Sequence, residues 1–390
     1  MGLETRGKAA RAPGRRRAAL GHAAALMAAW TLVGCAGRDR SGDSAEADGA
    51  VGPAGVDREF AATDPRIGVS GRTRPEAGSV RFDWPGVGVS VSMRGPAVAF
   101  ELEDEGRGNH FNVLVDGELR EVWKLRPGVH SYPVEDLGPG EHHLVLNKRT
   151  EAYPGVTTFR SLRLTGEGSL LPAPPPTGRR IEIVGASWVA GYGNEGDTYG
   201  SCPNLLEVSN NWESFGAIAA RSLAADYRVV AVSGQGVVRN AGDPEPVSAE
   251  PFPAQYGRVL WNDPASRWDF TSWTPHAVVV NLGLNDHTTD PRPPPDVFQA
   301  GYAAFLHRLR GHYPDAHIFC VNITGWPHFA SLVEGVVEAA RRNGDARVSF
   351  TAIPSFPLRE MGCDWHPRVE GHHAIAEVLA PVIASTLGWD

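Results

Sequence analysis

The sequence predicts two folded domains in tandem, an antiparallel β-sandwich over residues 66–168 and an α/β domain with a parallel sheet over residues 181–390. Three observations support this prediction: short alternating runs broken by turn residues, a proline-rich stretch at 169–180, and apolar strands that then alternate with helical patterns. A chain of 390 residues, 42% of them hydrophobic, is long and apolar enough for two domains.

The first 35 residues have the order of a bacterial export signal. Six basic residues between Arg6 and Arg17 precede an alanine- and leucine-rich run that ends in Leu32-Val33-Gly34-Cys35. That run is short for a membrane-spanning helix and a polar tail follows it, which indicates a signal peptide. Leu-Val-Gly-Cys resembles the lipobox of bacterial lipoproteins, so we predict that residues 1–35 are a lipoprotein signal and that Cys35 carries the lipid. A plain signal peptide or a membrane anchor is the alternative.

This signal predicts an exported protein that a lipid anchors to the bacterial cell envelope. Ala36-Gly37 after the cysteine, without aspartate in second position, favours the outer membrane or the cell surface. Residues 36–58 are small, polar and free of aromatic side chains, a composition typical of flexible tethers. We therefore predict a tether over residues 36–65.

Residues 66–168 alternate between apolar and polar side chains with period two. Runs such as SVRFDW, GVSVSM, AVAFELED and NVLVDG are separated by glycine, proline and Asp-Gly turns. This pattern is typical of antiparallel strands with one buried face, and Asp116-Gly117 predicts a hairpin turn. The proline content of the next stretch predicts a semi-rigid linker over 169–180.

The region from residue 181 onward alternates between apolar strands and helical patterns. Strands are expected at 181–184, 228–232, 277–282, 317–323 and 347–352. Helices are expected near 210–225, 296–311, 330–342 and 369–387. Apolar, β-branched strands of this kind indicate a parallel sheet with helices on both faces, and ligands bind at the carboxyl ends of such strands.

Four segments with chemically active side chains follow these strands or precede the last helix. They are Ser187 in VGASWVAGYGN, the SGQG stretch at 233–236, the NLGLNDH stretch at 281–287 and the CDWHP stretch at 363–367. Because the carboxyl ends of parallel strands share one edge of the sheet, we expect these segments to converge there.

These residue types meet the needs of ester hydrolysis. A serine hydroxyl becomes nucleophilic when an imidazole takes its proton, and a carboxylate can hold that imidazole in the required tautomer. Ser187, His366 and Asp364 supply these groups. The N–H groups of Ser187 and a glycine, with the Asn285 amide, are suitable donors to an oxyanion. Taken singly, each has another interpretation as a turn cap, a surface histidine or a turn residue.

The order of these blocks resembles that of the SGNH or GDSL-type hydrolases. The matching residues are Gly185-Ala186-Ser187, Gly234 or Gly236, Gly283-Leu284-Asn285-Asp286 and Asp364-Trp365-His366-Pro367. Within that group, GYGNEG after the serine, KRTEA at 148–152 and DWHP are similar to carbohydrate esterase family 2. The resemblance implies a jelly-roll sandwich followed by an SGNH hydrolase, a three-layer α/β domain with a flavodoxin-like parallel sheet. It also implies that O-acetyl groups are removed from polysaccharides such as xylan and glucomannan, through an acyl-enzyme and without a metal or cofactor.

Carried over to this chain, the resemblance implies a role for Ser187 and for three members of the last block. Ser187 is then the nucleophile, His366 the general base and then the general acid, and Asp364 the carboxylate that orients it. Trp365 resembles an active-site aromatic residue that stacks on a sugar, with a packing role as the alternative.

The resemblance also implies an oxyanion hole. Its donors are the N–H of Ser187, the N–H of Gly236 with Gly234 as the alternative, and the side chain of Asn285. One departure is Ala186, where the family has aspartate. We expect altered support of the surrounding loops there rather than an inactive protein.

Composition and cysteine usage limit other functions. The net charge of −8 offers no basic surface for nucleic acid. The sequence has no CxxC or HExxH pattern, so a zinc site has little support. We expect an acetylated polysaccharide as the partner and contact with a membrane only through the lipid. The sequence leaves open the oligomeric state and whether Cys202 and Cys363 form a disulfide.

Two other functions stay open on sequence grounds. A glycan-binding surface lipoprotein with a catalytically silent hydrolase domain is consistent with Ala186 and the sandwich. An esterase that acts on lipid or peptidoglycan is consistent with an envelope location. The β domain and the aromatic-rich loop with Trp261, Trp268 and Trp273 favour a sugar substrate, with packing as the alternative role of these tryptophans.

Overall fold

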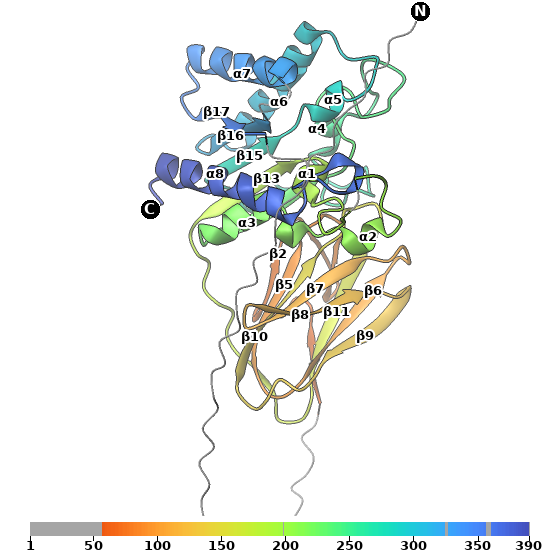
Figure 1. The fold of residues 1–390 in the computed structure, drawn as a ribbon. Coiled ribbons are helices and arrows are strands. Elements are labelled where there is room, and N and C mark those ends of the chain that lie inside the picture. Colours follow the sequence, from red (N-terminus) through yellow and green to blue (C-terminus); the bar gives the residue numbers. More distant parts are fainter. Residues whose placement is uncertain (1–56, 198, 324–326, 356–359, 390) are drawn as a thin grey trace, which may run out of the picture. The chain divides into compact units, whose positions relative to one another are not determined.

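The computed structural model describes residues 57–389 except 198, 324–326 and 356–359 (Figure 1). The predicted signal peptide over residues 1–35, with its lipidation site Cys35, lies outside the described residues. Within the described part of the chain, no helix combines the length and the apolar character that crossing a membrane requires.

The predicted tether over residues 36–65 extends too far, because its last part contains a strand. Arg58–Ala61 form β1, which pairs antiparallel with β11 (Thr157–Leu164). Phe60 packs against the apolar core, and this nonlocal contact gives the segment its place in the sheet. The sandwich therefore begins at Arg58 rather than at residue 66.

The first domain is a sandwich of two antiparallel sheets (Figure 1). In one sheet the order is β3 (Arg74–Glu76), β4 (Ser79–Phe82), β11, β6 (Val98–Asp104) and β9 (Gly128–Val134), with β1 beside β11. In the other it is β12 (Ser169–Leu170), β5 (Gly88–Arg94), β10 (Glu141–Lys148), β7 (His110–Val115) and β8 (Glu118–Lys124), with β2 (Ile67–Ser70) beside β5. Because β12 pairs with β5, the first two residues of the predicted linker belong to the sandwich.

The predicted hairpin turn at Asp116-Gly117 is confirmed. It joins β7 to β8, and both of its residues have positive φ, 53° for Asp116 and 92° for Gly117. A two-residue hairpin whose residues both have positive φ follows the right-handed twist of its strands, which explains the Asp-Gly pair.

The second domain is a five-stranded parallel sheet with helices on both faces. The strand order is β14 (Asp226–Ala231), β13 (Arg180–Gly185), β15 (Ala277–Asn281), β16 (His317–Ile323) and β17 (Val348–Ile353). One face carries α6 (Pro295–His312) and α7 (Pro327–Arg342), and the other carries α3 (Phe215–Ser222) and α8 (Val369–Leu387). Numbered within the domain, this order is 2-1-3-4-5, that of flavodoxin-like folds. The predicted fold class is confirmed.

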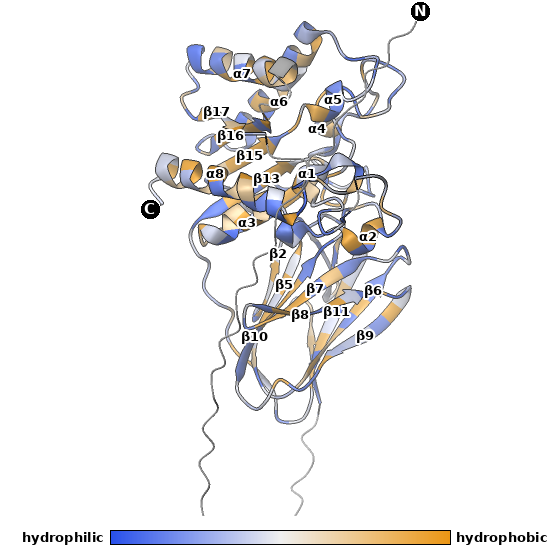
Figure 2. Ribbon diagram, viewed as in Figure 1, coloured by the Kyte–Doolittle hydropathy of each residue, from blue (hydrophilic) through white to orange (hydrophobic). Residues whose placement is uncertain are grey.

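Alternate residues of each strand enter two different cores. In β13, Ile183 packs with α3 and α8, whereas its neighbour Val184 belongs to the cluster that includes α6 and α7, and both are fully buried. Figure 2 shows the same hydrophobic character along β15 and β16. Strands buried on both faces favour apolar residues at nearly every position, which explains the near-continuous apolar runs in the sequence.

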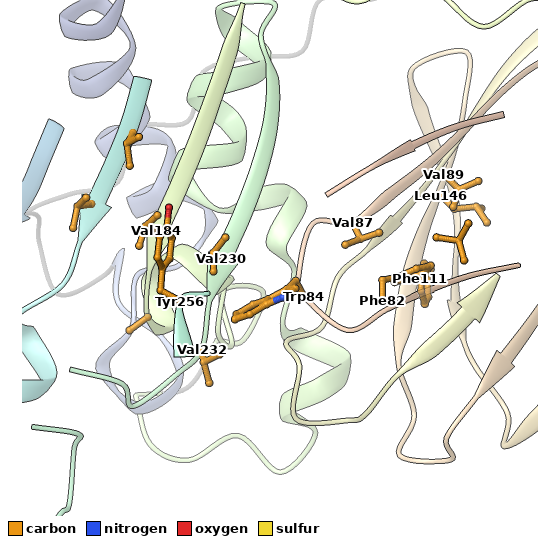
Figure 3. Packing of buried hydrophobic residues seen from close by; sticks show 14 of the residues in the cluster. Phe82, Trp84, Val87, Val89, Phe111, Leu146, Val184, Val230, Val232 and Tyr256 are labelled. Atoms are coloured by element: carbon orange, nitrogen blue, oxygen red, sulfur yellow. The ribbon is translucent and has the colours of Figure 1, made fainter. Parts of the chain in front are cut away.

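The two domains share a buried interface centred on Trp84 (Figure 3). The Trp84 side chain is fully buried and belongs to the same apolar cluster as Val87 of the sandwich and Val230 and Val232 of the α/β domain. Its indole N–H donates a 2.9 Å hydrogen bond to the carbonyl oxygen of Val259. One apolar core is therefore continuous across both domains.

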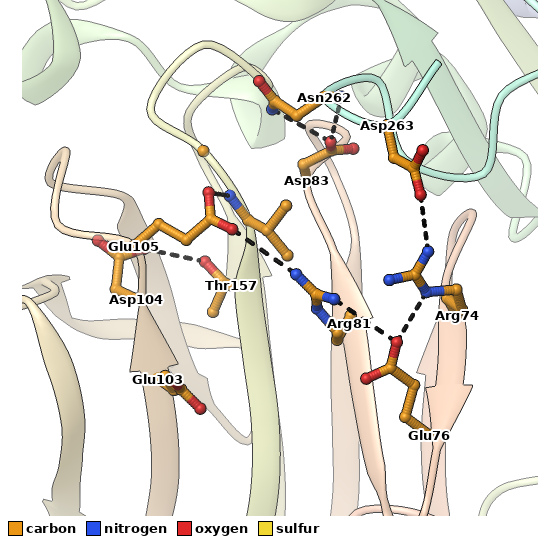
Figure 4. Close-up of polar contacts among 12 residues, drawn as sticks. Arg74, Glu76, Arg81, Asp83, Glu103, Asp104, Glu105, Thr157, Asn262 and Asp263 are labelled. Carbon is orange, nitrogen blue, oxygen red and sulfur yellow. Dashed lines mark hydrogen bonds and ion pairs between the residues drawn. The ribbon is translucent and has the colours of Figure 1, made fainter. Parts of the chain in front are cut away.

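Charged side chains flank this interface (Figure 4). The Asp83 carboxylate accepts hydrogen bonds from the backbone N–H groups of Trp261 and Asn262, at 3.0 and 2.9 Å. Burial raises the pKa of Asp83, and these N–H groups compensate for the water that the carboxylate has lost. Arg74 forms an ion pair with Asp263 at 2.9 Å. The sandwich is thus bonded directly to the loop that precedes β15.

Candidate active site

Ser187 lies where β13 ends and the short helix α1 (Ser187–Ala190) begins. The preceding glycine makes this junction possible. A Cβ atom on Gly185 would lie only 2.9 Å from the carbonyl oxygen of Asn281 and 2.4 Å from Cγ2 of Val189. The serine side chain therefore sits at the carboxyl edge of the sheet, as predicted from its position after a strand.

The structure brings His366 and Ser187 together. The Nε2 atom of His366 lies 2.7 Å from Oγ of Ser187, which is a hydrogen-bond distance. On the other side of the ring, Nδ1 lies 3.1 Å from the carbonyl oxygen of Cys363 and 3.0 Å from that of Asp364. Both of these neighbours only accept hydrogen bonds, so Nδ1 carries a proton and Nε2 is free to accept the serine proton.

The environment keeps this imidazole neutral. Burial lowers the pKa of His366 below its ordinary value, although the two carbonyl oxygens and the charge of Asp364 act in the opposite direction. A neutral imidazole with a bare Nε2 is the form that can take a proton from a hydroxyl. The pair can therefore work as a nucleophile and its general base near neutral pH.

The expectation that the Asp364 carboxylate orients the histidine is wrong, because this side chain does not contact His366. Its carboxylate accepts hydrogen bonds from the hydroxyl groups of Tyr192, at 2.7 Å, and of Ser201, at 3.1 Å. The cause is the backbone, since Asp364 and Trp365 both adopt left-handed conformations with φ of 48° and 61°. This turn directs the carbonyl oxygen of Asp364, instead of its carboxylate, at Nδ1 of His366.

Tyr192 is a neighbour of the histidine that the sequence analysis missed. Its ring centre lies 4.4 Å from that of His366, with 35° between the ring planes. Burial, followed by the bond to Asp364, raises the pKa of the Tyr192 phenol, which therefore stays protonated and donates. The only signal in the sequence was its place in the GYGNEG motif.

A disulfide joins Cys202 to Cys363, with 5.5 Å between the Cα atoms. This finding resolves a pairing that the sequence left open. The bridge tethers the segment that bears Asp364 and His366 to the segment that bears Ser201. Gly196 makes room for it, because a Cβ there would lie 2.2 Å from Sγ of Cys363.

The loop after β14 and the short helix α5 (Leu284–His287) place the predicted oxyanion donors. The Asn285 side-chain amide donates to the carbonyl oxygen of Gln235 at 2.9 Å, so the two segments meet as predicted. The N–H of Gly236, however, donates to Oδ1 of Asn240 at 3.1 Å, inside its own loop. Gly236 is a glycine for another reason, since a Cβ there would lie 1.9 Å from the carbonyl oxygen of Arg239. Gly234 has a positive φ of 77°, which also favours glycine.

Asp286 fixes the backbone at the end of this loop. Its carboxylate accepts hydrogen bonds from three consecutive backbone N–H groups, those of Val237, Val238 and Arg239, at 3.0, 2.7 and 2.9 Å. Burial raises the pKa of Asp286 to about 6 although these three bonds lower it. The aspartate of the NLGLNDH stretch therefore shapes the loop rather than contacting the serine or the histidine.

A cavity of about 430 Å³ opens above Ser187 and His366. Its described lining is largely apolar and includes Trp188, Phe329 and Met361. Trp365 also lines it and is 59% exposed, with the ring of Tyr199 at 5.6 Å. A concave, mostly apolar site with a few convergent polar groups is the usual form of a small-molecule site.

Two family models match the chain, one for each domain. Residues 69–174 match the carbohydrate esterase 2 N-terminal model, and residues 183–374 match the GDSL-like lipase/acylhydrolase model. Among curated proteins, the cellulase/esterase CelE of Acetivibrio thermocellus is 35% identical over 316 residues, which cover 78% of this chain. The chain spans only 38% of the length of that relative. An acetylxylan esterase/glucomannan deacetylase of Cellvibrio japonicus is 29% identical over 77% of this chain and 84% of its own length.

Solved structures agree with these matches. A family two carbohydrate esterase from Clostridium thermocellum, in complex with cellohexaose, is 34% identical and has a TM-score of 0.78. The alignment covers 83% of this chain and all of that one. A family two carbohydrate esterase from Cellvibrio japonicus is 25% identical with a TM-score of 0.77, over 86% of this chain and 99% of the other. The resemblance drawn from the sequence is confirmed, and the chain belongs to carbohydrate esterase family 2, a family of carboxylic ester hydrolases.

Proposed function

We propose that this protein is a serine esterase that removes O-acetyl groups from a polysaccharide through an acyl-enzyme intermediate. The observation that carries the proposal is the 2.7 Å contact between Ser187 Oγ and His366 Nε2 at the floor of a cavity. The two carbonyl oxygens at Nδ1 take the orienting part that a carboxylate plays in other serine hydrolases.

In the first step, His366 takes the proton of Ser187 as Oγ attacks the acetyl carbonyl carbon. The tetrahedral oxyanion then collapses, the bond to the sugar oxygen breaks, and His366 returns the proton to that oxygen. The acetyl group stays on Ser187 as an ester. Water, activated by the same imidazole, releases acetate and restores the serine.

We assign the oxyanion hole to the N–H groups of Ser187 and Gly234 and to the side chain of Asn285. From the sequence, Gly236 is the expected donor, with Gly234 as the alternative. Gly236 is the weaker candidate because its N–H already donates to Asn240. Asn285 lines the cavity and bonds to the carbonyl oxygen of Gln235, the residue that follows Gly234. Removing one such donor typically costs ~10²–10³ in kcat.

The proposed substrate is an acetylated polysaccharide of the xylan or glucomannan type. Two observations support it. Trp365, which lines the cavity, and Tyr199 beside it present exposed aromatic surface, and aromatic faces stack on the apolar faces of sugar rings. Relatives of the chain are named acetylxylan esterase/glucomannan deacetylase, and another was crystallised with cellohexaose.

The test is acetate release by residues 36–390 from 4-nitrophenyl acetate, acetylated xylan and acetylated glucomannan. Ser187→Ala should abolish turnover, whereas Ser131→Ala, on an exposed sandwich strand, should leave it unchanged. Binding of polysaccharide without serine-dependent release would instead support the silent glycan-binding alternative. Faster release of long acyl chains than of acetate would support a lipid substrate.

We further propose that the enzyme is exported and anchored to the cell envelope through a lipid on Cys35. The order of basic residues, apolar run and cysteine in residues 1–35 supports this location. The Cys202–Cys363 disulfide is consistent with an oxidising compartment. Radiolabelled palmitate should label the full chain in bacterial cells, and Cys35→Ala should abolish the label. Equal labelling of both proteins would refute the anchor.

A further inference from the structure

We propose that Glu151 and Tyr153, both from the β-sandwich side of the interface, position the peptide that donates to the oxyanion. This inference rests on the proposed esterase function. It makes the sandwich a working part of the catalytic site rather than only a neighbouring domain. Both residues follow β10: Glu151 lies within the KRTEA stretch at 148–152, and Tyr153 comes directly after it.

The contacts converge on Ser233, the residue before Gly234. The two carboxylate oxygens of Glu151 accept hydrogen bonds from the N–H of Ser233, at 2.6 Å, and from its hydroxyl, at 2.5 Å. The Tyr153 hydroxyl donates to the carbonyl oxygen of Ser233 at 2.9 Å. Residues of the sandwich side thus bond to all three polar groups of this one residue.

The third bond matters most, because the carbonyl group of Ser233 and the N–H of Gly234 belong to the same peptide unit. That unit is planar, so a bond that fixes the carbonyl oxygen also fixes the direction of the N–H. A hydrogen bond accepted by the oxygen also polarises the amide and strengthens donation from its nitrogen. Tyr153 therefore both aims and activates the proposed oxyanion donor.

The segment that carries Glu151 and Tyr153 is itself held firmly. The fully buried side-chain nitrogen of Lys148 donates to the carbonyl oxygens of Thr150, at 2.7 Å, and Glu151, at 2.6 Å. The ring of Tyr153 packs edge-on against Trp261, with 4.9 Å between ring centres. A rigid support is what positioning demands, since small displacements of a donor lose much of its effect.

The contacts of Glu151 and Tyr153 with Ser233 are not needed merely to join the two domains. Trp84 and Asp83 already bond the sandwich to the loop that precedes β15. Glu151 is only 7% exposed, and burial raises the pKa of its carboxyl group. Burying a carboxylate is costly, and here the carboxylate faces the loop that carries the oxyanion donor.

Tyr153→Phe is the sharpest test, because it keeps the ring on Trp261 and removes only the hydroxyl. On 4-nitrophenyl acetate we expect kcat to fall about tenfold with KM changed less than about twofold, since the donor remains but is no longer held. The inhibition constant of phenylboronic acid, which forms a tetrahedral adduct with the serine oxygen, should rise by a similar factor. Glu151→Gln, which cannot accept both bonds from Ser233, should act in the same direction.

The matched control is Tyr132→Phe. Tyr132 also lies in the sandwich and its hydroxyl also makes one hydrogen bond, accepting from the N–H of Arg126 at 2.8 Å. This variant should keep wild-type kcat and boronate affinity even if its melting temperature falls.

Two outcomes would overturn the proposal. One is wild-type kcat in both Tyr153→Phe and Glu151→Gln. The other is a lower kcat with unchanged boronate affinity, as expected of a purely structural role. If Ser187→Ala remains inactive in the same assay, the proposed esterase function survives either result. A fully active Ser187→Ala would instead overturn the esterase function itself.

Discussion

Removing the Asp364 carboxylate should have a small effect on catalysis. Among the residues that the structure describes, this carboxylate has two hydrogen-bond partners, Tyr192 and Ser201, and neither is the histidine. Where a carboxylate holds the catalytic histidine directly, its loss lowers kcat by about 10⁴. Here the loss of two hydrogen bonds, at about 1 kcal/mol each, would loosen the loop but leave both carbonyl oxygens at Nδ1.

Two substitutions distinguish the effect of the Asp364 charge from the effect of its backbone conformation. Asp364→Asn keeps an acceptor for Tyr192 and tolerates the left-handed conformation, so kcat should fall no more than about threefold. Asp364→Ala also strains the backbone at φ of 48°, by about 1 kcal/mol, so kcat should fall about tenfold. Tyr192→Phe, which removes the shorter of the two bonds, should resemble Asp364→Asn.

The assay is steady-state hydrolysis of 4-nitrophenyl acetate, with circular dichroism to show that each variant is folded. A loss of about 10³ or more in folded Asp364→Asn would refute the reasoning. It would mean that the carboxylate reaches the imidazole during turnover.

The histidine, the disulfide and Trp365 each allow a further test. Because burial lowers the pKa of His366, the acid limb of kcat/KM against pH should have its midpoint below 6.5, the ordinary pKa of histidine. Activity should persist at pH values above that midpoint. A midpoint above 6.5 would contradict the burial argument. The double variant Cys202→Ser/Cys363→Ser should lower the free energy of unfolding by about 3 kcal/mol in a urea titration. It should also lower kcat, because the loop that bears His366 loses its tether. An unchanged kcat would show that the tether is dispensable. Trp365→Ala should raise the KM for acetylated xylan by about tenfold, whereas the KM for 4-nitrophenyl acetate should change little, since only the polymer extends to the exposed tryptophan. Equal effects on both substrates would indicate that Trp365 has a packing role instead.

The parts of the fold that the sequence predicted well are those set by local pattern. Near-continuous apolar runs located the strands of the α/β domain because strands covered on both faces favour apolar residues at nearly every position. The parallel arrangement then brought Ser187 and Asn285 to one edge, since the carboxyl ends of such strands meet there. Strand β1 was missed because the run REFA is short and gains its place only from pairing with β11.

Other features could not be predicted because they depend on backbone conformation. The spacing of Asp364 and His366 is compatible with a carboxylate contact, but two consecutive left-handed residues turn the carboxylate away. The two glycines of SGQG look equivalent in sequence. In the structure, the bond from the N–H of Gly236 to Asn240 distinguishes them as oxyanion donors.

Glu182 shows why the sandwich and the catalytic domain have to be understood together. It lies within β13, five residues before the nucleophile, and is 1% exposed. A carboxylate at this depth needs partners, and one of them, the fully buried Arg72 at 3.0 Å, comes from the sandwich. Tyr256 and Tyr313 of the α/β domain donate to the same carboxylate. Without Arg72 the strand that leads to Ser187 would hold an uncompensated buried charge, at a cost of about 3–5 kcal/mol. The sandwich therefore supports the nucleophile through this ion pair at β13. This support is separate from that of Glu151 and Tyr153, which contact the loop that carries the proposed oxyanion donor.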